Sequence, residues 1–356
     1  MLMKIKPLLL HPKQRELLYP ESHSRRSLPL NIEAADLGLF RHELYKDIPG
    51  TALLQFERCR VTGSGMLFRG VRIFEESFGY RSMLDEWASI RNVLRFLVRN
   101  YALRELRTCD ENAVLFTDTW SGAYFHWITD ALTRLYALGA RAKGATILVP
   151  LAYAQLEYTL SSLAPFNIGA IRYLNKNQVL LCQRLMVPTH TAPSGHYNAS
   201  VLRGLRDLLI DHFRGRDPIR GNERVYISRR KARVRRVVNE AEVEAVLEQY
   251  GFKTTCFEDF AFAEQLAFAS TARYIVSNHG AGLTNMLFMP AGGSVLELRK
   301  AGDSHNNCYF SLASSLGLRY FYQLCDTKDP TEDVFSADLL VDTGRLKTNI
   351  SLMLAG

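Results

Sequence analysis

The stretch RYIVSNHGAGLTNMLFMPAGGSVLEL, residues Arg273–Leu298, decides the fold. Its first five residues, Arg273–Ser277, have an aromatic and β-branched centre, Tyr274 to Val276, and predict a short buried strand. A glycine-rich turn follows, then residues Ala281–Met289 carry apolar side chains at helical spacing, and Ser294–Leu298 predict a second strand. A strand, turn, helix and strand in this order indicate parallel pairing with a right-handed crossover.

The turn itself is a candidate anion site. A helix N-terminus presents unpaired backbone N–H groups and a dipole that favours negative charge, and glycines let a phosphate approach the backbone. Asn278 and His279 add side-chain donors at the carboxyl end of the strand, where ligands bind in open α/β sheets. The candidate residues are therefore Asn278, His279, Gly280, Ala281 and Gly282. A tight turn without a ligand would show the same pattern, and the glycine spacing is not that of the dinucleotide fingerprint.

Composition bounds the class of protein. A chain of 356 residues predicts two domains of ordinary size. An apolar content of 47% with 22% charged residues is typical of a soluble globular protein. The net charge of +8 indicates an acidic partner, which could be a phosphorylated ligand, an anionic membrane surface or nucleic acid, and does not choose among them.

Cysteine usage and hydropathy predict the compartment. The six cysteines are scattered, with no CxxC pair and no zinc spacing, which is typical of thiols in a reducing compartment. The apolar run near the N-terminus is too short for a signal peptide, and no other stretch approaches the roughly 20 apolar residues of a spanning helix. We expect a cytoplasmic protein, with peripheral contact at the inner face of the cell membrane left open.

The pattern along the chain predicts two α/β domains that face a cleft. The N-terminal domain would span residues 1–215, with a β-rich elaboration to about residue 110. Within it, residues 83–101 fit a helix and a strand equally well. A second domain would span 216–330 after a linker at 214–222, and a strand and helix tail would span 331–356. A cleft between two α/β domains is a common place for a substrate.

His126 and Asp130 are the candidate catalytic pair. They are spaced i and i+4 on a helix that follows an apolar strand, so they share one helix face. A carboxylate beside an imidazole orients the ring and raises its basicity, which suits a general base. Either residue could be the base. The same spacing would also arise from simple side-chain pairing in an amphipathic helix.

The basic run Arg229–Arg236 follows another apolar strand, Arg224–Ser228. Arg229 and Arg230 come first, so we expect them at the same sheet edge as the glycine turn, where guanidinium groups match phosphate oxygens. The later basic residues of the run fit a solvated loop. Nothing aromatic is interleaved with them, so nucleic acid is not among the expected partners. No acidic or cysteine pattern predicts a metal site.

Four motifs together resemble glycosyltransferase family 61, which includes bacterial capsular and exopolysaccharide enzymes, plant xylan glycosyltransferases and animal EGF-domain O-GlcNAc transferases. They occur in order over roughly Leu115 to Leu354. Two departures are Ala123, where the family often has asparagine, and Thr133, where bacterial members often have proline. The motifs are YFHWITDALTRL (124–135), YISRR with VVNE (226–240), SNHGAGLTNMLFMPAG (277–292) with VLEL, and NCYFSLASSLGLRYFY (307–322).

The resemblance implies an enzyme of the GT-B type, with two Rossmann-like domains that face a cleft. The domain at 1–215 would lie on the acceptor side, and the C-terminal domain would bind the nucleotide sugar. The reaction would invert the anomeric centre without a metal or other cofactor. It places Asn285 and Glu297 in the donor site beside the arginines and the turn. The expected partners are a nucleotide-diphosphate sugar, first of all a UDP-sugar, and a glycan or lipid-linked glycan acceptor of a capsule, exopolysaccharide or lipopolysaccharide. Two alternatives remain open: a polyanion-binding protein that is not an enzyme, and another Rossmann-type nucleotide-dependent enzyme.

Overall fold

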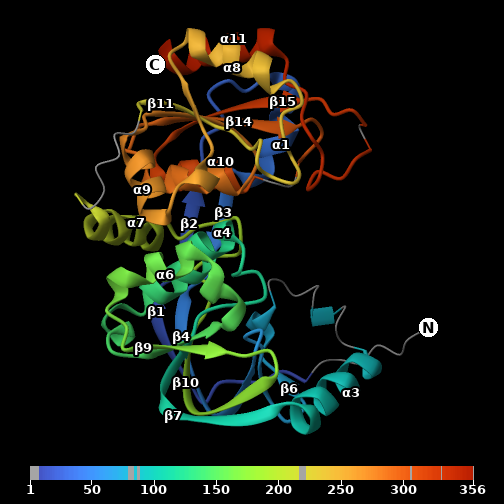
Figure 1. Ribbon diagram of the computed structural model, residues 1–356, viewed down its shortest axis with the longest axis vertical. Helices are drawn as coiled ribbons and strands as arrows, with labels where there is room; N and C mark the ends of the chain where they lie inside the picture. Colours follow the sequence, from blue (N-terminus) through green and yellow to red (C-terminus); the bar gives the residue numbers. More distant parts are fainter. Residues whose placement is uncertain are drawn as a thin grey trace. The chain divides into compact units, whose positions relative to one another are not determined.

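The computed structural model describes residues 8–78, 84–85, 89–215, 222–304, 307–329 and 331–355. The chain divides into two compact units. Unit 1 comprises residues 1–22 and 49–194, and unit 2 comprises residues 23–48 and 195–356. Each unit is built around its own β-sheet with helices against it, which confirms the predicted α/β class (Figure 1).

Among its described residues, unit 1 contains eight strands in one sheet, four α-helices and several short 3₁₀ or π turns. The strands are β1 (Gln14–Tyr19), β4 (Thr51–Thr62), β5 (Leu67–Arg69), β6 (Arg72–Ile73), β7 (Glu105–Leu115), β8 (Thr146–Pro150), β9 (Ala170–Leu174) and β10 (Gln178–Pro188). The helices are α3 (Ile90–Val98), α4 (Tyr124–His126), α5 (Leu132–Ala137) and α6 (Glu157–Leu163). The 3₁₀ turns are η3 (Glu75–Ser77), η6 (Gly139–Ala142), η7 (Leu151–Gln155) and η8 (Ala164–Phe166), and the π turns are η4 (Arg99–Leu103) and η5 (Trp127–Ala131).

The sheet of unit 1 is mixed. Its order is β6-β5-β4-β10-β7-β8-β9, with β1 also paired to β4. The strands from β10 to β9 are parallel, whereas β4 runs antiparallel to β10. Counted from β7, the parallel strands lie in the order 3-2-1-4, which is the order of half a Rossmann fold. Strands β1, β4, β5 and β6, all before residue 110, extend this sheet with antiparallel pairs, as the prediction of a β-rich elaboration requires.

One connection of unit 1 departs from the Rossmann pattern. Only residues 175–177 separate β9 from β10, and a chain this short reaches about 14 Å at most. The long strands β7 and β10 must therefore curve until their first residues return to the end of β9. The guanidinium of Arg172 on β9 accordingly donates to the carbonyl of Thr108 on β7 at 2.6 Å. No helix covers this crossover.

Unit 2 contains a five-stranded sheet, a separate strand pair and six α-helices among its described residues. Its strands are β2 (Ser22–Arg25), β3 (Tyr45–Ile48), β11 (Arg224–Ile227), β12 (Lys253–Thr255), β13 (Tyr274–Asn278), β14 (Ser294–Lys300) and β15 (Arg319–Cys325). Its α-helices are α1 (Leu37–Phe40), α7 (Ala199–Phe213), α8 (Glu240–Gln249), α9 (Phe262–Thr271), α10 (Cys308–Leu316) and α11 (Thr343–Ala355). Its 3₁₀ turns are η1 (Ala34–Asp36), η2 (Arg41–Glu43), η9 (Phe257–Asp259) and η10 (Ala281–Phe288).

The sheet of unit 2 is wholly parallel, in the order β12-β11-β13-β14-β15. Counted within the unit this is 2-1-3-4-5, the second common order of doubly wound folds. Helices α8 and α11 pack on one face, where Val243 and Ile350 share a core with Val276 of β13. Helices α9 and α10 cover the other face (Figure 1). Such an order has its switch point between β11 and β13, where crossovers leave in opposite directions.

The unit boundaries differ from the predicted domain boundaries. The division falls after Ser194 rather than after residue 215, because α7 packs on α9 and α10 of unit 2. The segment 23–48 also belongs to unit 2. There the Phe40 ring packs 4.9 Å from the ring of Tyr322, and the Asn31 amide donates to the Tyr322 carbonyl at 2.6 Å. The predicted linker lies mostly on residues 216–221, outside the described residues.

The ambiguous stretch at 83–101 resolves, over its described residues, into helix α3. The strand–turn–helix–strand unit at 273–298 has the predicted order, except that its helix, η10, has 3₁₀ geometry. None of the described helices combines the length and the apolar content that a bilayer-spanning helix needs.

Candidate functional site

The glycine turn of unit 2 lies at the switch point of its sheet. Strands β11 and β13 are neighbours in parallel register, with Ile227 paired to Ser277. The chain leaves β11 at Ser228–Arg229 and leaves β13 at Asn278–Gly282, so both exits share one sheet edge. Ligands of open α/β sheets bind at this position. The prediction that Arg229 and the turn lie together is confirmed.

Arg229 lies directly against Gly280. A Cβ atom added to Gly280 would stand 2.4 Å from one terminal nitrogen of the Arg229 guanidinium and 2.7 Å from its central carbon. Gly280 has an extended backbone, with φ 167°, so a glycine is needed here for space and not for backbone freedom. The guanidinium reaches the carbonyls of Val234 and Arg235 only at 3.3 and 3.4 Å. Arg229 is 9% exposed.

Buried polar groups without a protein partner gather beside this arginine. The Asn278 side-chain amide donates to the Arg235 carbonyl, and its Oδ1 is buried without a hydrogen-bond partner among the described residues. The Nε of Arg235 is also buried and has no hydrogen-bond partner in the same part of the chain. Arg235 has φ +57°, a left-handed conformation that is uncommon for a residue with a side chain. Buried groups left unsatisfied in this way call for a ligand or an ordered water.

The charge at the turn is also unbalanced. Among the residues that the structure describes, neither Arg229 nor Arg235 forms an ion pair. Burial lowers the pKa of the Arg229 guanidinium, and the neighbouring Arg235 cation lowers it further. A guanidinium remains charged at neutral pH all the same. Two neighbouring cations, neither in an ion pair among the described residues, are an arrangement that favours a bound anion.

Glu297 fixes the orientation of the His279 ring. Its Nδ1 lies 2.5 Å from Oε1 of Glu297, and the second carboxylate oxygen accepts from the Tyr320 hydroxyl at 2.5 Å. Tyr309 packs on the His279 ring and donates to the Gly280 carbonyl at 2.7 Å. Glu297 is fully buried, so its carboxylate orients His279 instead of facing a ligand.

The other residues assigned to the donor site lie in two different places. Asn285 is fully buried and donates to the Gly282 carbonyl at 3.1 Å, so it braces the turn from inside. The Arg230 side chain points away from the glycine turn and forms ion pairs with Glu240 and Glu244 of α8. Ala281 and Gly282 begin η10 directly after the turn. The structure therefore separates two adjacent arginines that the sequence presents alike.

In unit 1 the structure brings His126 and Asp130 together as predicted. Nδ1 of His126 lies 2.8 Å from Oδ2 of Asp130. Ser194 donates to the same Asp130 oxygen at 2.8 Å, and Thr129 donates to the other at 3.2 Å. With Asp130 ionised, the proton of the imidazole stays on Nδ1, which leaves the lone pair on Nε2. Asp130 is buried, whereas the His126 side chain is partly exposed.

The local backbone at this pair is irregular. Helix α4 ends at His126, the π turn η5 carries Asp130, and α5 continues from Leu132. π turns within helices occur frequently at functional sites, because the wider turn re-aims the side chains around it. Ser194, 64 residues further along the chain, completes the cluster, and nothing in the local sequence pattern reveals it.

A second cluster in unit 1 was missed by the sequence reasoning. His190 lies between two carboxylates, with Nε2 at 2.8 Å from Asp118 and Nδ1 at 3.3 Å from Glu76. Asp118 and His190 follow the carboxyl ends of β7 and β10, which are neighbouring parallel strands. The rule that placed Arg229 at a sheet edge would have found both residues once the pairing of β7 with β10 was known. In the part of the chain that the structure describes, no group of three or more His, Cys, Asp or Glu side chains is placed to hold a metal ion.

Charges set the protonation of this cluster. Burial alone would raise the pKa of Asp118, but the hydrogen bond from His190 and the charge of Arg134 hold it well below its usual range. Burial lowers the pKa of His190, as does Arg134, but hydrogen bonds to Asp118 and Glu76 outweigh both and raise it. Arg134 is fully buried, and its Nε donates to the Pro188 carbonyl at 2.9 Å. His190 is therefore favoured as the cation between two anions.

Part of this chain is similar to a known protein family. Residues 124–296 match the family model Glycosyltransferase 61, from the first residue of α4 into β14. That range contains both the His126–Asp130 pair and the Arg229–Gly280 turn. This chain contains a glycosyltransferase family 61 domain over these residues.

Named proteins that this chain resembles are transferases of eukaryotes. It is 39% identical over 98 residues to an EGF domain-specific O-linked N-acetylglucosamine transferase of Drosophila melanogaster, covering 27% of this chain and 18% of that protein. It is 28% identical over 257 residues to the β-1,2-xylosyltransferase XAX1 of Oryza sativa subsp. japonica, covering 64% of this chain and 45% of that protein. The chain thus spans less than half the length of these relatives.

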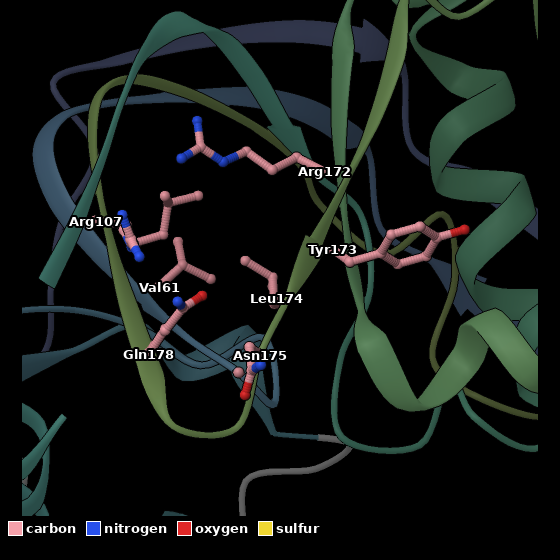
Figure 2. A pocket seen from close by; sticks show the side chains of 9 residues that line it. Val61, Arg107, Arg172, Tyr173, Leu174, Asn175 and Gln178 are labelled. Atoms are coloured by element: carbon pink, nitrogen blue, oxygen red, sulfur yellow. The ribbon is translucent and has the colours of Figure 1, made fainter. Parts of the chain in front are cut away.

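A surface pocket of unit 1 lies away from the candidate site residues of that unit. It is found at the first residues of β7 and β10, where Arg107, Arg172 and Gln178 surround Leu174, while Tyr173 points away (Figure 2). Arg107 pairs with Glu105 at 2.5 Å, and Gln178 donates to Glu105 at 2.8 Å. These polar groups satisfy one another, and the pocket is at the opposite end of β7 from His126. It is not part of the candidate site.

Proposed function

We propose that this chain is a glycosyltransferase that moves a sugar from a nucleotide-diphosphate donor to a glycan acceptor. The observation that carries the proposal is the buried Arg229, without an ion-pair partner among the described residues, against Gly280 at the switch point of unit 2. The family match and the transferase names of the relatives support the same reaction class. The reaction and both substrates are inferences from these features.

The donor diphosphate would bind at the turn of unit 2. Its phosphate oxygens would accept from Arg229, from backbone N–H groups at the start of η10 and from Asn278. When the bond to the sugar breaks, the leaving diphosphate gains negative charge. Donors that are already fixed in place stabilise that charge without reorganisation, which lowers the barrier. His279, oriented by Glu297, is available to the same anion.

His126 would be the general base for the acceptor hydroxyl. Asp130 fixes the tautomer with the lone pair on Nε2, so the ring accepts the hydroxyl proton as the oxygen attacks the anomeric carbon. The imidazolium that forms is stabilised by the Asp130 carboxylate. Asp130 is itself held by Ser194 and Thr129, which makes it an orienting group in this scheme.

The finer features of the scheme belong to the proposal as well. Two Rossmann-like units that act on one pair of substrates correspond to the GT-B architecture, and one direct displacement inverts the anomeric centre. Arginines and backbone donors would take the part that a metal ion plays in other transferases. We also propose that the donor is a UDP-sugar and that the acceptor is a glycan of a bacterial surface polysaccharide. These two assignments rest on the resemblance of the motifs alone.

The contacts of the basic run disfavour the polyanion-binding alternative. Arg230 is paired with Glu240 and Glu244, and Lys231 is paired with Asp259. Side chains that are already neutralised offer little to an extended anion. Arg229 differs from them, because its guanidinium is buried against the turn.

Calorimetry with UDP, GDP and CMP tests the donor site. We expect Arg229→Ala to weaken binding of the preferred nucleotide by about 10- to 150-fold, the loss of one charged hydrogen-bond partner. Arg230→Ala is the matched control, since it removes the adjacent guanidinium, and it should leave the affinity unchanged. Equal losses in the two variants, or binding of NAD or heparin in place of a nucleotide, would contradict the proposal.

A further inference from the structure

Helix α3 and the π turn η4 that continues it carry an apolar row on the surface of unit 1. The row is Ile90, Leu94 and Val98, spaced four residues apart, and their exposed fractions are 43%, 57% and 54%. Leu103, in η4, is 75% exposed at the end of the same segment. Large apolar side chains scattered singly on a surface are ordinary, but a continuous row along one helix is not.

The opposite side of the helix holds it in a fixed orientation. The ring of Phe96 packs edge-on at 4.9 Å against Phe68 of β5, and Tyr101 packs on the same ring at 5.8 Å. Ser89 caps the N-terminus by accepting from the backbone N–H of Asn92 at 3.3 Å. In Figure 1, α3 lies at the rim of unit 1, next to β6. The apolar row therefore faces outward because the other face of the helix is anchored.

A row of arginines runs beside the apolar row. Arg91, Arg95 and Arg99 each follow one of the three apolar residues, and all three are exposed. Because successive helix residues are turned by about 100°, the two rows are adjacent stripes on one surface. Residues 89–104 contain a fourth arginine and no aspartate or glutamate. The segment is strongly amphipathic and wholly cationic.

We infer that α3–η4 is a docking helix for an anionic lipid bilayer surface. A helix with an apolar face and an arginine-rich border lies in the plane of the membrane interface, with apolar side chains among the acyl chains and guanidinium groups at the headgroups. Anionic lipids attract each basic residue near the surface. The net charge of +8 adds to this attraction. The inference does not rest on the proposed glycosyl transfer.

The arginine row argues against a second copy of the chain as the occupant. In a two-fold interface the same patch faces itself, so the arginines of one copy would stand opposite those of the other. With no acidic residue in the segment, nothing there would neutralise them. An anionic surface satisfies the apolar row and the arginine row at once.

Sedimentation of the full chain with vesicles tests the inference. Vesicles of phosphatidylcholine alone are compared with vesicles that also contain phosphatidylglycerol, at low and at high salt. We expect binding to the anionic vesicles only, weakened by salt. Leu94→Ser should weaken it about ten-fold, and each of Arg91→Gln and Arg95→Gln about five-fold. Leu352→Ser on α11 and Arg203→Gln on α7 are exposed matched controls and should bind as the unaltered chain does.

Several results would overturn the inference. They are no binding to anionic vesicles, equal binding to neutral ones, and equal losses in the control variants. Self-association in the absence of lipid that is lost in Leu94→Ser would assign the row to a second copy instead. All altered residues are on the surface, and an unchanged melting temperature verifies that each variant is folded. Nucleotide affinity, measured in the same samples, reports separately on the donor site.

Discussion

Replacing Gly280 with alanine tests the closeness of the turn to Arg229. The new Cβ would stand 2.4 Å from a terminal guanidinium nitrogen, whereas ordinary contacts of this kind begin at 3.4 Å. The backbone at Gly280 is extended and accepts alanine without strain. The guanidinium therefore has to move by about 1 Å, and this displacement is the whole of the expected perturbation.

A displacement of that size removes a hydrogen bond. A donor at about 2.9 Å from a phosphate oxygen would end near 3.9 Å, which is beyond hydrogen-bonding range. Losing one charged hydrogen bond costs about 1.5–3 kcal/mol. We therefore expect Gly280→Ala to weaken binding of the nucleotide diphosphate by about 10- to 150-fold. The weak contacts of Arg229 to Val234 and Arg235 leave the guanidinium free to shift, so the loss of folding stability should be small.

A double-mutant cycle measured by calorimetry isolates the effect. In the Arg229→Ala background no guanidinium remains to be displaced, so Gly280→Ala should cost little further affinity. Gly38→Ala, at a glycine with open space around it in the same unit, is the control. Additive losses in the cycle, or an unchanged affinity in the single variant, would refute the assigned role of the turn.

Three further predictions concern unit 1 and the proposed independence of turnover from a metal ion. His126→Ala and Asp130→Asn should each lower turnover, and loss of the residue that acts as the base should lower it by about 100- to 10,000-fold. The double variant should be no slower than the slower single variant. Near-normal turnover in both single variants would show that the pair is structural. Turnover should persist when it is measured in EDTA. A loss of turnover in EDTA that manganese or magnesium reverses would show a metal requirement. The pKa of His190 is raised in the folded protein above the ordinary histidine value of 6.5. The charge of His190 therefore stabilises the fold fully at pH values below 6.5. This contribution is lost as the pH rises through the folded-state pKa. The melting temperature of His190→Gln should therefore lie furthest below that of the unaltered chain at low pH, with the gap narrowing as the pH rises; a gap independent of pH would contradict this.

Local pattern was enough to predict the turn. Strand β13, the glycine turn and strand β14 follow from β-branched runs separated by residues that break regular structure, and these preferences act over a few residues. The His126–Asp130 contact was also predictable, because i and i+4 side chains meet on any helix. The π geometry between them depends on packing and was not foreseen.

Long-range contacts account for the residues that the sequence did not reveal. Asp118 and His190 are 72 positions apart, and they meet only because β7 and β10 pair. Segment 23–48 joins unit 2 through Phe40 and Asn31, whose partners lie near residue 320. Such contacts leave no periodic signal in the local sequence, so neither the cluster nor the unit boundary could be read from it.

The sequence by itself determined the strands on either side of the glycine turn, and that two arginines follow a strand at the edge where an anion would bind. Only the tertiary structure decided between them. Arg229 lies against Gly280 because β11 and β13 are neighbours, whereas Arg230 points to the acidic residues of α8. Propensity and spacing are properties of neighbouring residues, but the charge that a side chain meets depends on which distant segments the fold packs beside it.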